Sequence, residues 1–510
     1  MTGFDISSIA IIGSGPGGLA ALYEFLHTNK DGTSTVHQER SSDPAFPKVV
    51  AFEQKDKAGG IWASSLDEAD LPVPPQDLLD TNNYHLPDVI HPRPQIPDNV
   101  GNATSDNPIV VKANVPLHEL EWRRSGVYPD LFTNIPSRFI RYSYIPLEEK
   151  YNDKSRIIYP FLTHGELSNR ISTFIESESL SDYIRTNSTV VKAEKNENGK
   201  WVLTVREKDP VTNTEKWYQE QFDAIVVANG HYTVPVFPKI EGLAEYNKKF
   251  PGVIVHTKSY RSQDKFKDKN VLVVGGSIST VNMLQYIVPV AKTTINSKRG
   301  YHYVFEWIND ALVSEGIVPK PQIQKFDPET GDIHFVDGTV AKDIDKVVLT
   351  TGYHYHYPFL DGQISVNNLS NLSRVGGLYK DTFSIADPTL ATVGVAISAL
   401  NFHTIEASAA AIAGVWSGAK TLPSQEEQQQ DEAQLVNKLG DNLFYHYKRW
   451  DVVQKDFIDP LHEYSTINRA SPLKVDGEFI HEIEEGIANL EKLYYNIKDQ
   501  KITVKETLLV

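Results

Sequence analysis

Close to its N-terminus this chain reads Ile9-Ala10-Ile11-Ile12-Gly13-Ser14-Gly15-Pro16-Gly17-Gly18-Leu19-Ala20. An apolar run with β-branched residues leads into three glycines with dinucleotide-binding spacing, and residues with helical spacing follow. Gly13 allows a sharp turn, Gly15 lets the backbone approach a pyrophosphate, and Gly18 brings the helix close to the strand. Because the N–H groups at the start of such a helix are free, they can bind the phosphates. The pattern therefore predicts a dinucleotide site, although an ordinary Gly-rich turn shares part of it.

A second run of this kind begins at Asn270 and ends in Val274-Gly275-Gly276-Ser277, which indicates a second nucleotide site. Residues 223–230 and 345–352 each form a buried-type strand that ends in a small polar residue and a glycine. Such strands leave the carboxyl edge of a parallel sheet beside a ligand. We therefore predict an α/β protein with two Rossmann-like domains. The smaller one is inserted into the larger, with boundaries at residues 1–229, 230–345 and 346–510.

The residues that end the ribose-side strands differ in charge between the two sites. Glu53 ends the predicted strand 49–53, and its carboxylate suits a ribose 2′-hydroxyl and repels a 2′-phosphate. The first site is therefore expected to bind FAD or NAD, and a solvated acid is the alternative. At the second site a strand ends in Lys298 and Arg299, as a 2′-phosphate requires. NADPH is therefore preferred over NADH there, and a solvated basic turn is the alternative.

The composition excludes several classes of protein. The chain has 510 residues, and its 50 Lys and Arg against 66 Asp and Glu give a net charge of −16, which argues against nucleic-acid and anionic-membrane partners. The absence of cysteine excludes disulfides, thiolate metal sites and the dithiol of flavin disulfide reductases. Because the first strand begins by Ile9 and residues 501–510 are short and charged, we expect no signal peptide and no transmembrane anchor. The expected location is cytoplasmic, with a peripheral membrane contact left open.

Two shorter motifs suit contact with a flat ring system. Gly59-Gly60-Ile61-Trp62 allows the backbone to pass close to such a ring, although an ordinary glycine turn also explains it. Leu131-Phe132-Thr133-Asn134-Ile135-Pro136 presents a carboxamide before a proline, and its alternative is an Asx turn.

The remaining sequence predicts scaffold. Residues 189–194 and 201–206 predict a hairpin, and residues 404–416 predict an Ala-rich helix. Ser424-Gln-Glu-Glu427 is a capping box that opens a polar helix. The function of the loops at 30–48 and 65–114 stays open, and no chemistry is expected after residue 418.

Just before the second glycine loop the chain reads Phe250-Pro251-Gly252-Val253-Ile254-Val255-His256-Thr257-Lys258-Ser259-Tyr260-Arg261. This pattern, F-x-G-x-x-x-H-x-x-x-Y between two Gly-rich loops, resembles the flavin-containing monooxygenases, which are class B flavoprotein monooxygenases, and soluble fungal members in particular. The resemblance extends over residues 9–418. Its other matching segments are Gly13 to Gly18, Glu53, Gly59 to Trp62, Thr133-Asn134, Asn229 to Tyr232, Thr351 to Tyr353, and Asp387 to Leu390 through Val415 to Gly418.

The resemblance implies a large FAD domain, a smaller NADPH domain and an enzyme of the N,N-dimethylaniline monooxygenase type. Such an enzyme inserts one oxygen of O2 into the nucleophilic nitrogen or sulfur of small amines, thiols or sulfides through a C4a-hydroperoxyflavin. The resemblance places the amide of Asn134 against the flavin, the retained NADP and the peroxide, as the catalytic residue. It places these residues at the cofactors: Gly13, Gly15, Pro16, Gly17, Gly18, Glu53, Gly60, Ile61, Trp62, Thr133, Asn134, Ile135, Val191, Gly275, Gly276, Ser277, Ser279, Thr280, Lys298 and Arg299.

One departure from the family pattern concerns the second loop, which lacks the third glycine. The resemblance puts Ser277, Ser279 and Thr280 around the NADP pyrophosphate, where hydroxyl groups can supplement backbone donors. His256 is expected to be a structural histidine. The run Tyr353-His-Tyr-His-Tyr357 has two histidines without evident further ligands, so we expect no metal.

Three alternative functions stay open. Tyr260-Arg261 stands where the related Baeyer–Villiger enzymes have Trp-Pro, which favours amine and sulfide oxygenation. A Baeyer–Villiger monooxygenase, an NADPH oxidase of the same fold and a non-catalytic flavin-binding protein are the alternatives. The sequence names neither the physiological substrate nor the oligomeric state, and a homo-oligomer is left open.

Overall fold

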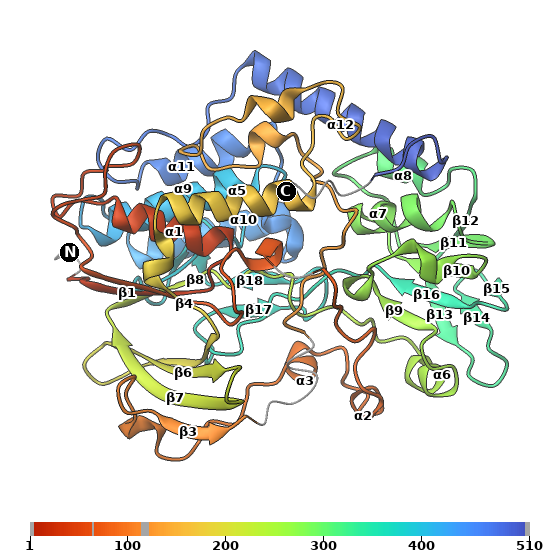
Figure 1. The fold of residues 1–510 in the computed structure, drawn as a ribbon, viewed down its shortest axis with the longest axis horizontal. Helices are drawn as coiled ribbons and strands as arrows, with labels where there is room; N and C mark the ends of the chain where they lie inside the picture. Colours follow the sequence, from red (N-terminus) through yellow and green to blue (C-terminus); the bar gives the residue numbers. More distant parts are fainter. Residues whose placement is uncertain (1–4, 64–65, 114–121, 505–510) are drawn as a thin grey trace.

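The computed structural model describes residues 5–63, 66–113 and 122–504, which form two α/β domains side by side (Figure 1). The first domain is built on a seven-stranded sheet in which β21 to β4 run parallel. Its order is β19 (Leu378–Tyr379), β20 (Phe383–Ser384), β21 (Leu390–Thr392), β8 (Ala224–Val227), β1 (Ser8–Ile12), β2 (Lys48–Phe52) and β4 (Ile184–Arg185). The predicted strand before the first glycine loop is β1.

Helices α1 (Pro16–Leu26) and α9 (Asn401–Trp416) pack against each other on this sheet. The alanines of α9 allow a close approach, and the rings of Phe25 and Trp416 stack with centroids 5.9 Å apart. Helix α9 confirms the predicted Ala-rich helix, and it begins earlier than expected.

Helix α5 (His164–Ser177) begins with a capping box formed by Thr163 and Glu166.

A four-stranded antiparallel sheet extends the first domain. Its order is β3 (Ile109–Lys112), β7 (Thr214–Phe222), β6 (Trp201–Asp209) and β5 (Ser188–Lys195). The predicted hairpin is confirmed, because β5 and β6 pair from Ser188 to Lys195 and close opposite Trp201.

The second domain is built on a fully parallel five-stranded sheet. Its order is β12 (Ile317–Lys320), β11 (Thr293–Ser297), β10 (Asn270–Val274), β16 (Lys346–Leu349) and β9 (Ile254–His256). The domain also contains three helices, α6 (Leu243–Lys249), α7 (Ile278–Ile287) and α8 (Trp307–Ala311). A small second sheet is formed by β13 (Ile323–Phe326), β14 (Ile333–Phe335) and β15 (Val340–Ala341).

The second sheet continues past the boundary expected at residue 345. Strand β16 pairs in parallel with β10 and β9, so it belongs to the second sheet and does not return to the first. The sequence suggested otherwise because 345–352 matches 223–230 in form, and both segments are strands at the edge of a nucleotide site. The chain returns to the first domain after Leu349.

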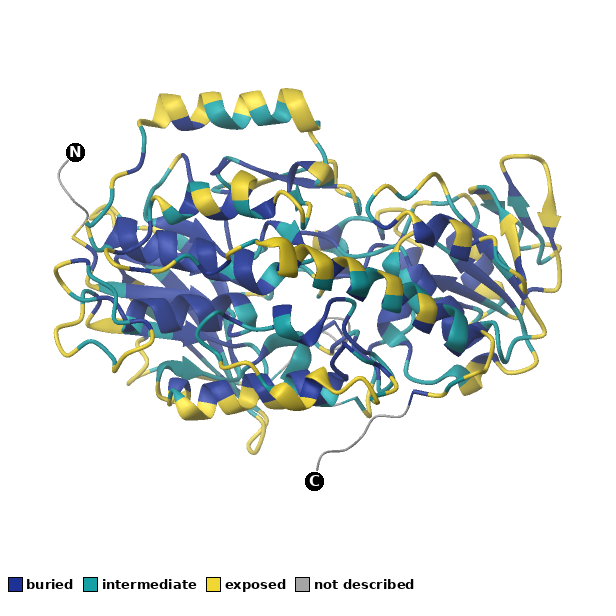
Figure 2. Cartoon of the chain, turned by 90° about the horizontal axis from the view of Figure 1, so that it is seen from above, coloured by how far each residue is buried: buried dark blue, intermediate teal, exposed yellow. Residues whose placement is uncertain are grey.

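Short elements complete the fold. These are α2 (Gln76–Leu79), α3 (Pro87–Ile90), α11 (Asp459–His462) and the pairs β17 (Ser365–Asn367) with β18 (Arg374–Gly376) and β22 (Ile397–Ser398) with β23 (Tyr447–Lys448). Helix α10 (Gln425–Leu439) stands out from the surface (Figure 2) and begins with the predicted capping box at Ser424. Within the described residues, no helix has the length and apolarity needed to cross a bilayer.

The last helix, α12 (Gly477–Lys498), runs across both domains (Figure 1). Phe479 and Ile483 in its first half pack into the core of the first domain. Leu490, Tyr494 and Ile497 in its second half pack with α7 in the core of the second domain. The helix therefore joins the two domains.

The C-terminal segment is tied to the first domain by a buried ion triad. The guanidinium of Arg469 lies 2.7 Å from a carboxylate oxygen of Glu24 in α1 and 2.5 Å from one of Glu406 in α9. All three side chains are at most 1% exposed. Burial raises the pKa of Glu24, and the two carboxylates raise the pKa of Arg469 against its own desolvation. Each charge in the triad therefore needs its partners.

We expect Arg469→Leu to destabilise the protein by about 3 to 5 kcal/mol, because it leaves two buried carboxylates without their cation. Arg449→Leu is the control, since Arg449 pairs with Asp451 at the surface and is 67% exposed. That change is expected to cost less than about 1 kcal/mol. Thermal unfolding of the purified variants measures both effects, and equal melting temperatures would contradict the assignment of the triad.

Candidate functional site

The first glycine loop has the backbone geometry predicted for it. Gly13 has φ +102°, and a Cβ there would lie 2.5 Å from the carbonyl oxygen of Ala228 at the end of β8. A Cβ at Gly18 would overlap the carbonyl oxygen of Gly13. One at Gly17 would lie 3.1 Å from the carbonyl oxygen of Val393. These contacts leave no room for side chains where β1, α1 and β8 meet.

Gly15 opens α1 and is approached by the second glycine motif. A Cβ at Gly60 would lie 2.8 Å from the Cα of Gly15, and the amide of Gly59 donates a hydrogen bond of 2.9 Å to the carbonyl of Ser14. Pro16 is the first residue of the helix. The two loops therefore form one bare backbone surface, which fits a pyrophosphate and the adjoining part of a flavin.

Residues 60–62 form a short 3-10 turn beside this surface, and none of their side chains is buried. The carbonyl of Trp62 lies 3.0 Å from Nε2 of His164, and its ring stacks on the same histidine with centroids 6.3 Å apart. The carbonyl of Ile61 accepts a hydrogen bond of 2.7 Å from the hydroxyl of Ser125. These contacts hold the turn against α5 and against Ser125.

Glu53 follows β2 and is 4% exposed. Its Oε2 accepts hydrogen bonds from the amide (3.0 Å) and hydroxyl (2.8 Å) of Ser14, and its Oε1 accepts from the amide of Lys55 at 3.0 Å. A carboxylate has about four acceptor positions, so one stays available for a ribose hydroxyl. The side chain thus also fixes the glycine loop, which the sequence did not reveal.

Val191 lies at an irregularity of β5, where the pairing register with β6 shifts between Val190 and Lys192. Its side chain is 3% exposed and packs with Val100 and Trp217. A cofactor contact at this position would therefore involve the backbone rather than the side chain.

The turn with Thr133, Asn134 and Ile135 is fixed by its neighbours. The amide of Thr133 donates to the carbonyl of Leu162 at 2.8 Å, and its hydroxyl accepts from the amide of Leu162 at 3.1 Å. Asn134 is half-buried, and among the described residues its carboxamide has no hydrogen-bond partner. The alternative of an Asx turn is not seen, because the residue two positions on is Pro136, which has no N–H. The amide is free to bind a ligand.

The segment that carries this turn touches both domains. The Tyr142 hydroxyl donates a hydrogen bond of 2.6 Å to the carbonyl of Pro16 in α1. The Tyr286 hydroxyl in α7 donates one of 2.7 Å to the carbonyl of Asp130. Asn134 therefore lies on a segment held by the helices that start at the two glycine loops.

The second glycine loop ends at α7. Gly275 has φ +153°, and Ser277 and Ser279 lie at the open start of the helix. Thr280 replaces the third glycine and is fully buried; its hydroxyl lies 2.8 Å from that of Thr350 and accepts from the amide of Ser277 at 3.3 Å. The Thr280 hydroxyl therefore shapes the loop from behind, while Ser277 and Ser279 lie where a ligand can reach them.

A basic surface adjoins the second loop. Gly276 lies against Lys298, since a Cβ there would be 3.3 Å from the Cβ of Lys298. Together with Lys298 and Arg299, Lys320 lines a depression of about 450 Å³. Sequence reasoning missed Lys320 because it ends β12, and only the pairing of β12 with β11 brings it beside the predicted pair. Three cations at this edge suit a 2′-phosphate.

The motif from residue 250 to 261 connects the second domain to residues 68–72, which follow the turn that begins at Gly60. The amide of His256 donates to the carbonyl of Pro72 at 2.8 Å, and Arg261 donates to the carbonyl of Glu68 at 2.7 Å. Lys258 forms a fully buried ion pair with Asp70 at 2.9 Å. Burial lowers the pKa of Lys258 to about 8 despite this carboxylate. Nothing in the sequence around Asp70 indicated the pair.

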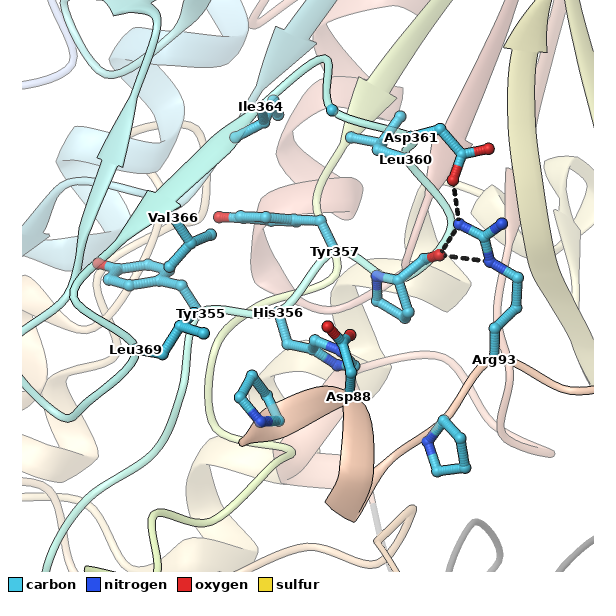
Figure 3. A pocket seen from close by; sticks show the side chains of 14 residues that line it. Asp88, Arg93, Tyr355, His356, Tyr357, Leu360, Asp361, Ile364, Val366 and Leu369 are labelled. Atoms are coloured by element: carbon cyan, nitrogen blue, oxygen red, sulfur yellow. Dashed lines mark hydrogen bonds and ion pairs between the residues drawn. The ribbon is translucent and has the colours of Figure 1, made fainter. Parts of the chain in front are cut away.

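The last three residues of the Tyr-His-Tyr-His-Tyr run, Tyr355, His356 and Tyr357, line a cavity of about 560 Å³ (Figure 3). Nε2 of His356 lies 2.9 Å from Oδ1 of Asp88, and Arg93 pairs with Asp361 at 2.7 Å. Burial lowers the pKa of His354 to about 4, so this residue is neutral near pH 7. In the part of the chain that is described, no group of three or more His, Asp or Glu side chains is arranged to hold a metal ion.

The family model described as FMO-like, flavin-binding monooxygenase-like, matches residues 118–318 and 306–475, which is more than half of the chain. The chain belongs to the flavin-binding monooxygenase-like family. This membership confirms the predicted resemblance and implies FAD and NADPH as cofactors.

Relatives of this flavin-binding monooxygenase-like protein include fungal and bacterial enzymes. The flavin-containing monooxygenase ustF2 of Aspergillus flavus is 26% identical over 86% of this chain and 88% of its own length. The trimethylamine monooxygenase of Methylocella silvestris is 28% identical over 84% of this chain and 78% of its own length. The structure of S-allyl-L-cysteine S-oxygenase from Allium sativum has the same fold, with a TM-score of 0.67 at 22% identity, over 96% of this chain and 94% of that one.

His256 provides a pH-dependence prediction. It is 1% exposed, burial lowers its pKa from 6.5 to about 3, and its Nδ1 accepts a hydrogen bond of 3.1 Å from the amide of Lys258. The unfolded chain binds a proton below pH 6.5 that the folded protein excludes, so stability is present above that pH and falls by about 1.4 kcal/mol per pH unit below it. The melting temperature should therefore fall less steeply between pH 7 and 5 in His256→Asn than in the wild type. The exposed His481→Asn is the control, and equal slopes for all three proteins would contradict a buried neutral His256.

Proposed function

We propose that this protein is an NADPH-dependent monooxygenase that transfers one oxygen atom of O2 to the nucleophilic nitrogen or sulfur of a small amine, thiol or sulfide. The second oxygen atom is reduced to water by the two electrons that NADPH supplies. The proposal rests chiefly on the half-buried carboxamide of Asn134, which has no partner among the described residues and lies on the segment between the two glycine loops. No nucleophilic side chain or metal is required for this reaction.

The residues present fit both cofactors. The bare backbone of Gly13, Gly15 and Gly60 and the acceptor of Glu53 suit FAD in the first domain. We assign this domain to residues 1–229 and the chain after Leu349, except where these segments pack into the core of the second domain. The loop from Gly275 and the three neighbouring cations suit NADPH in the second domain. When bound, FAD supplies hydride acceptance from NADPH and activation of O2.

The protein's own part is to place a donor and exclude water. The Asn134 amide donates a hydrogen bond to charge that develops on oxygen during the transfer. The bonds between Thr133 and Leu162 hold that amide in place before the reaction begins. Ile135 is 1% exposed and closes the turn against solvent, which limits the competing loss of hydrogen peroxide.

The substrate class is supported by two relatives. By their names, trimethylamine monooxygenase acts on an amine and S-allyl-L-cysteine S-oxygenase acts on a sulfide. Oxygen uptake, peroxide and oxygenated product are therefore to be measured with a thioether, an amine and a ketone. Oxygenation of the ketone alone would indicate a Baeyer–Villiger enzyme, and formation of peroxide alone would indicate an oxidase. If NADPH does not bleach the flavin, the protein is non-catalytic.

The role of Asn134 is tested with Asn134→Ala. We expect flavin binding and NADPH oxidation to persist while oxygenated product falls by about 10²- to 10³-fold, because an oxyanion-type donor is lost and peroxide release needs none. NADPH, peroxide and product are followed in one reaction. Asn152→Ala at the surface is the control, and a wild-type ratio of product to NADPH in Asn134→Ala would show that Asn134 is only a turn residue.

Cofactor preference is tested by replacing Lys298 and Arg299 with alanine. Loss of two charge-assisted contacts of about 1.5 to 3 kcal/mol each should weaken NADPH binding at least tenfold and leave NADH binding nearly unchanged. Lys248→Ala with Lys249→Ala removes the same charge from α6 in the same domain and is the control. If titration of both nucleotides shows an unchanged preference for NADPH, other residues bind the phosphate.

A further inference from the structure

The chain on the N-terminal side of Asn134 is held by helix α7. The hydroxyl of Tyr286 donates its 2.7 Å hydrogen bond to the carbonyl of Asp130, four residues before Asn134. The ring of Tyr128 packs against Tyr286 and Tyr260 with centroids 6.0 and 5.0 Å away. The start of this segment is therefore part of the core of the second domain.

The chain on the C-terminal side of Asn134 is held by helix α12. Gly486 faces Pro136 so closely that a Cβ on the glycine would lie 2.5 Å from Cγ and 2.9 Å from Cδ of the proline. The rings of Phe139 and Phe479 meet with centroids 4.8 Å apart, and Arg138 forms an ion pair with Glu482. Along the chain, only Ile135 lies between Asn134 and Pro136, the residue that contacts Gly486.

A shift of Pro136 must move Asn134. The proline ring is bonded to the backbone at both ends, so it cannot turn away from an added methyl group as a flexible side chain would. Thr133 is fixed to Leu162 on the other side, and Ile135 is buried. A displacement of Pro136 therefore moves Asn134 and Ile135, the two residues between Thr133 and Pro136.

We propose that Gly486 and Tyr286 are positioning residues that hold the Asn134 turn between α12 and α7. This inference rests on the proposed function of Asn134. Tyr286 is the penultimate residue of α7, and the same helix begins at the second glycine loop. One rigid element thus connects the phosphate-binding end of the second domain to the chain just before Asn134, and α12 fixes the chain just after it.

The first test uses Gly486→Ala. Relief of a 2.5 Å contact to ordinary van der Waals distance requires a shift of about 1 Å, and a misplacement of that size can cost up to about 10²-fold in rate. Product formation should fall toward that limit, while flavin content and NADPH oxidation persist. Gly477→Ala is the matched control on the same helix, because a Cβ there meets nothing within 4 Å.

The second test uses Tyr286→Phe, which removes the hydrogen bond to Asp130 and keeps the ring. It decides the question if Gly486→Ala fails to fold. Tyr144→Phe is its control, since the Tyr144 hydroxyl is buried without a hydrogen-bond partner among the described residues. Hydrogen exchange of residues 130–139 gives a readout that does not depend on turnover. It should be faster in Gly486→Ala and Tyr286→Phe than in the two controls.

The outcomes separate this inference from the proposed function. Asn134→Ala is run in parallel, and the double variant Asn134→Ala/Gly486→Ala should show no further loss of product per NADPH than Asn134→Ala alone. If Asn134→Ala uncouples while Gly486→Ala and Tyr286→Phe keep the wild-type ratio and exchange rates, the positioning role is wrong and the proposed function stands. If Asn134→Ala itself keeps the wild-type ratio, the role of Asn134 is wrong, and the inference fails with it.

Discussion

Close contact between backbone segments at the first glycine loop is the constraint on which this structure depends. The end of β8 approaches Gly13, the carbonyl oxygen of Gly13 occupies the space of a side chain at Gly18 in α1, and the second glycine motif lies against Gly15. A side chain at any of these points would separate a strand, a helix or a loop from the others. Because the space is kept free of side chains, backbone amides and the helix N-terminus can face a pyrophosphate. The same requirement determines how closely the sheet, the covering helices and the turn at Gly60 approach one another.

The second domain is attached to this centre through a buried ion pair and several hydrogen bonds. Lys258 and Asp70 form a buried ion pair between the domains, and Arg261 binds the carbonyl of Glu68. Tyr142 and Tyr286 fix the Asn134 segment to α1 and α7. These contacts join residues that lie far apart in sequence. The chemistry that we propose needs few reactive side chains because the cofactors perform the redox steps.

Local sequence patterns predicted the elements whose structure depends on their own residues. Strand β10 spans Asn270–Val274 as expected, the hairpin of β5 and β6 closes at Trp201, and Ser424 caps α10. Each of these depends on alternation, turn residues or a capping box, which are properties of adjacent residues. The sharp turn at Gly13 and the close approach of helix and strand at Gly18 were predictable for the same reason.

Features set by distant pairing could not be predicted in this way. Strand β16 belongs to the second sheet because β9 and β10 flank it, Lys320 joins the basic surface because β12 pairs with β11, and Thr280 turns its hydroxyl to Thr350. The crossing of both domains by α12 was equally hidden, since an amphipathic helix does not specify what its apolar face will meet.

The reaction that we propose transfers oxygen from O2 to nitrogen or sulfur of the substrate. Its most direct test is turnover of the purified, FAD-loaded protein with NADPH, a thioether or tertiary amine, and ¹⁸O2 in ordinary water, with the product analysed by mass spectrometry. We expect a sulfoxide or N-oxide that carries one ¹⁸O atom for each NADPH consumed. Product that carries oxygen from water, or consumption of NADPH with hydrogen peroxide as the sole oxygen product, would contradict it.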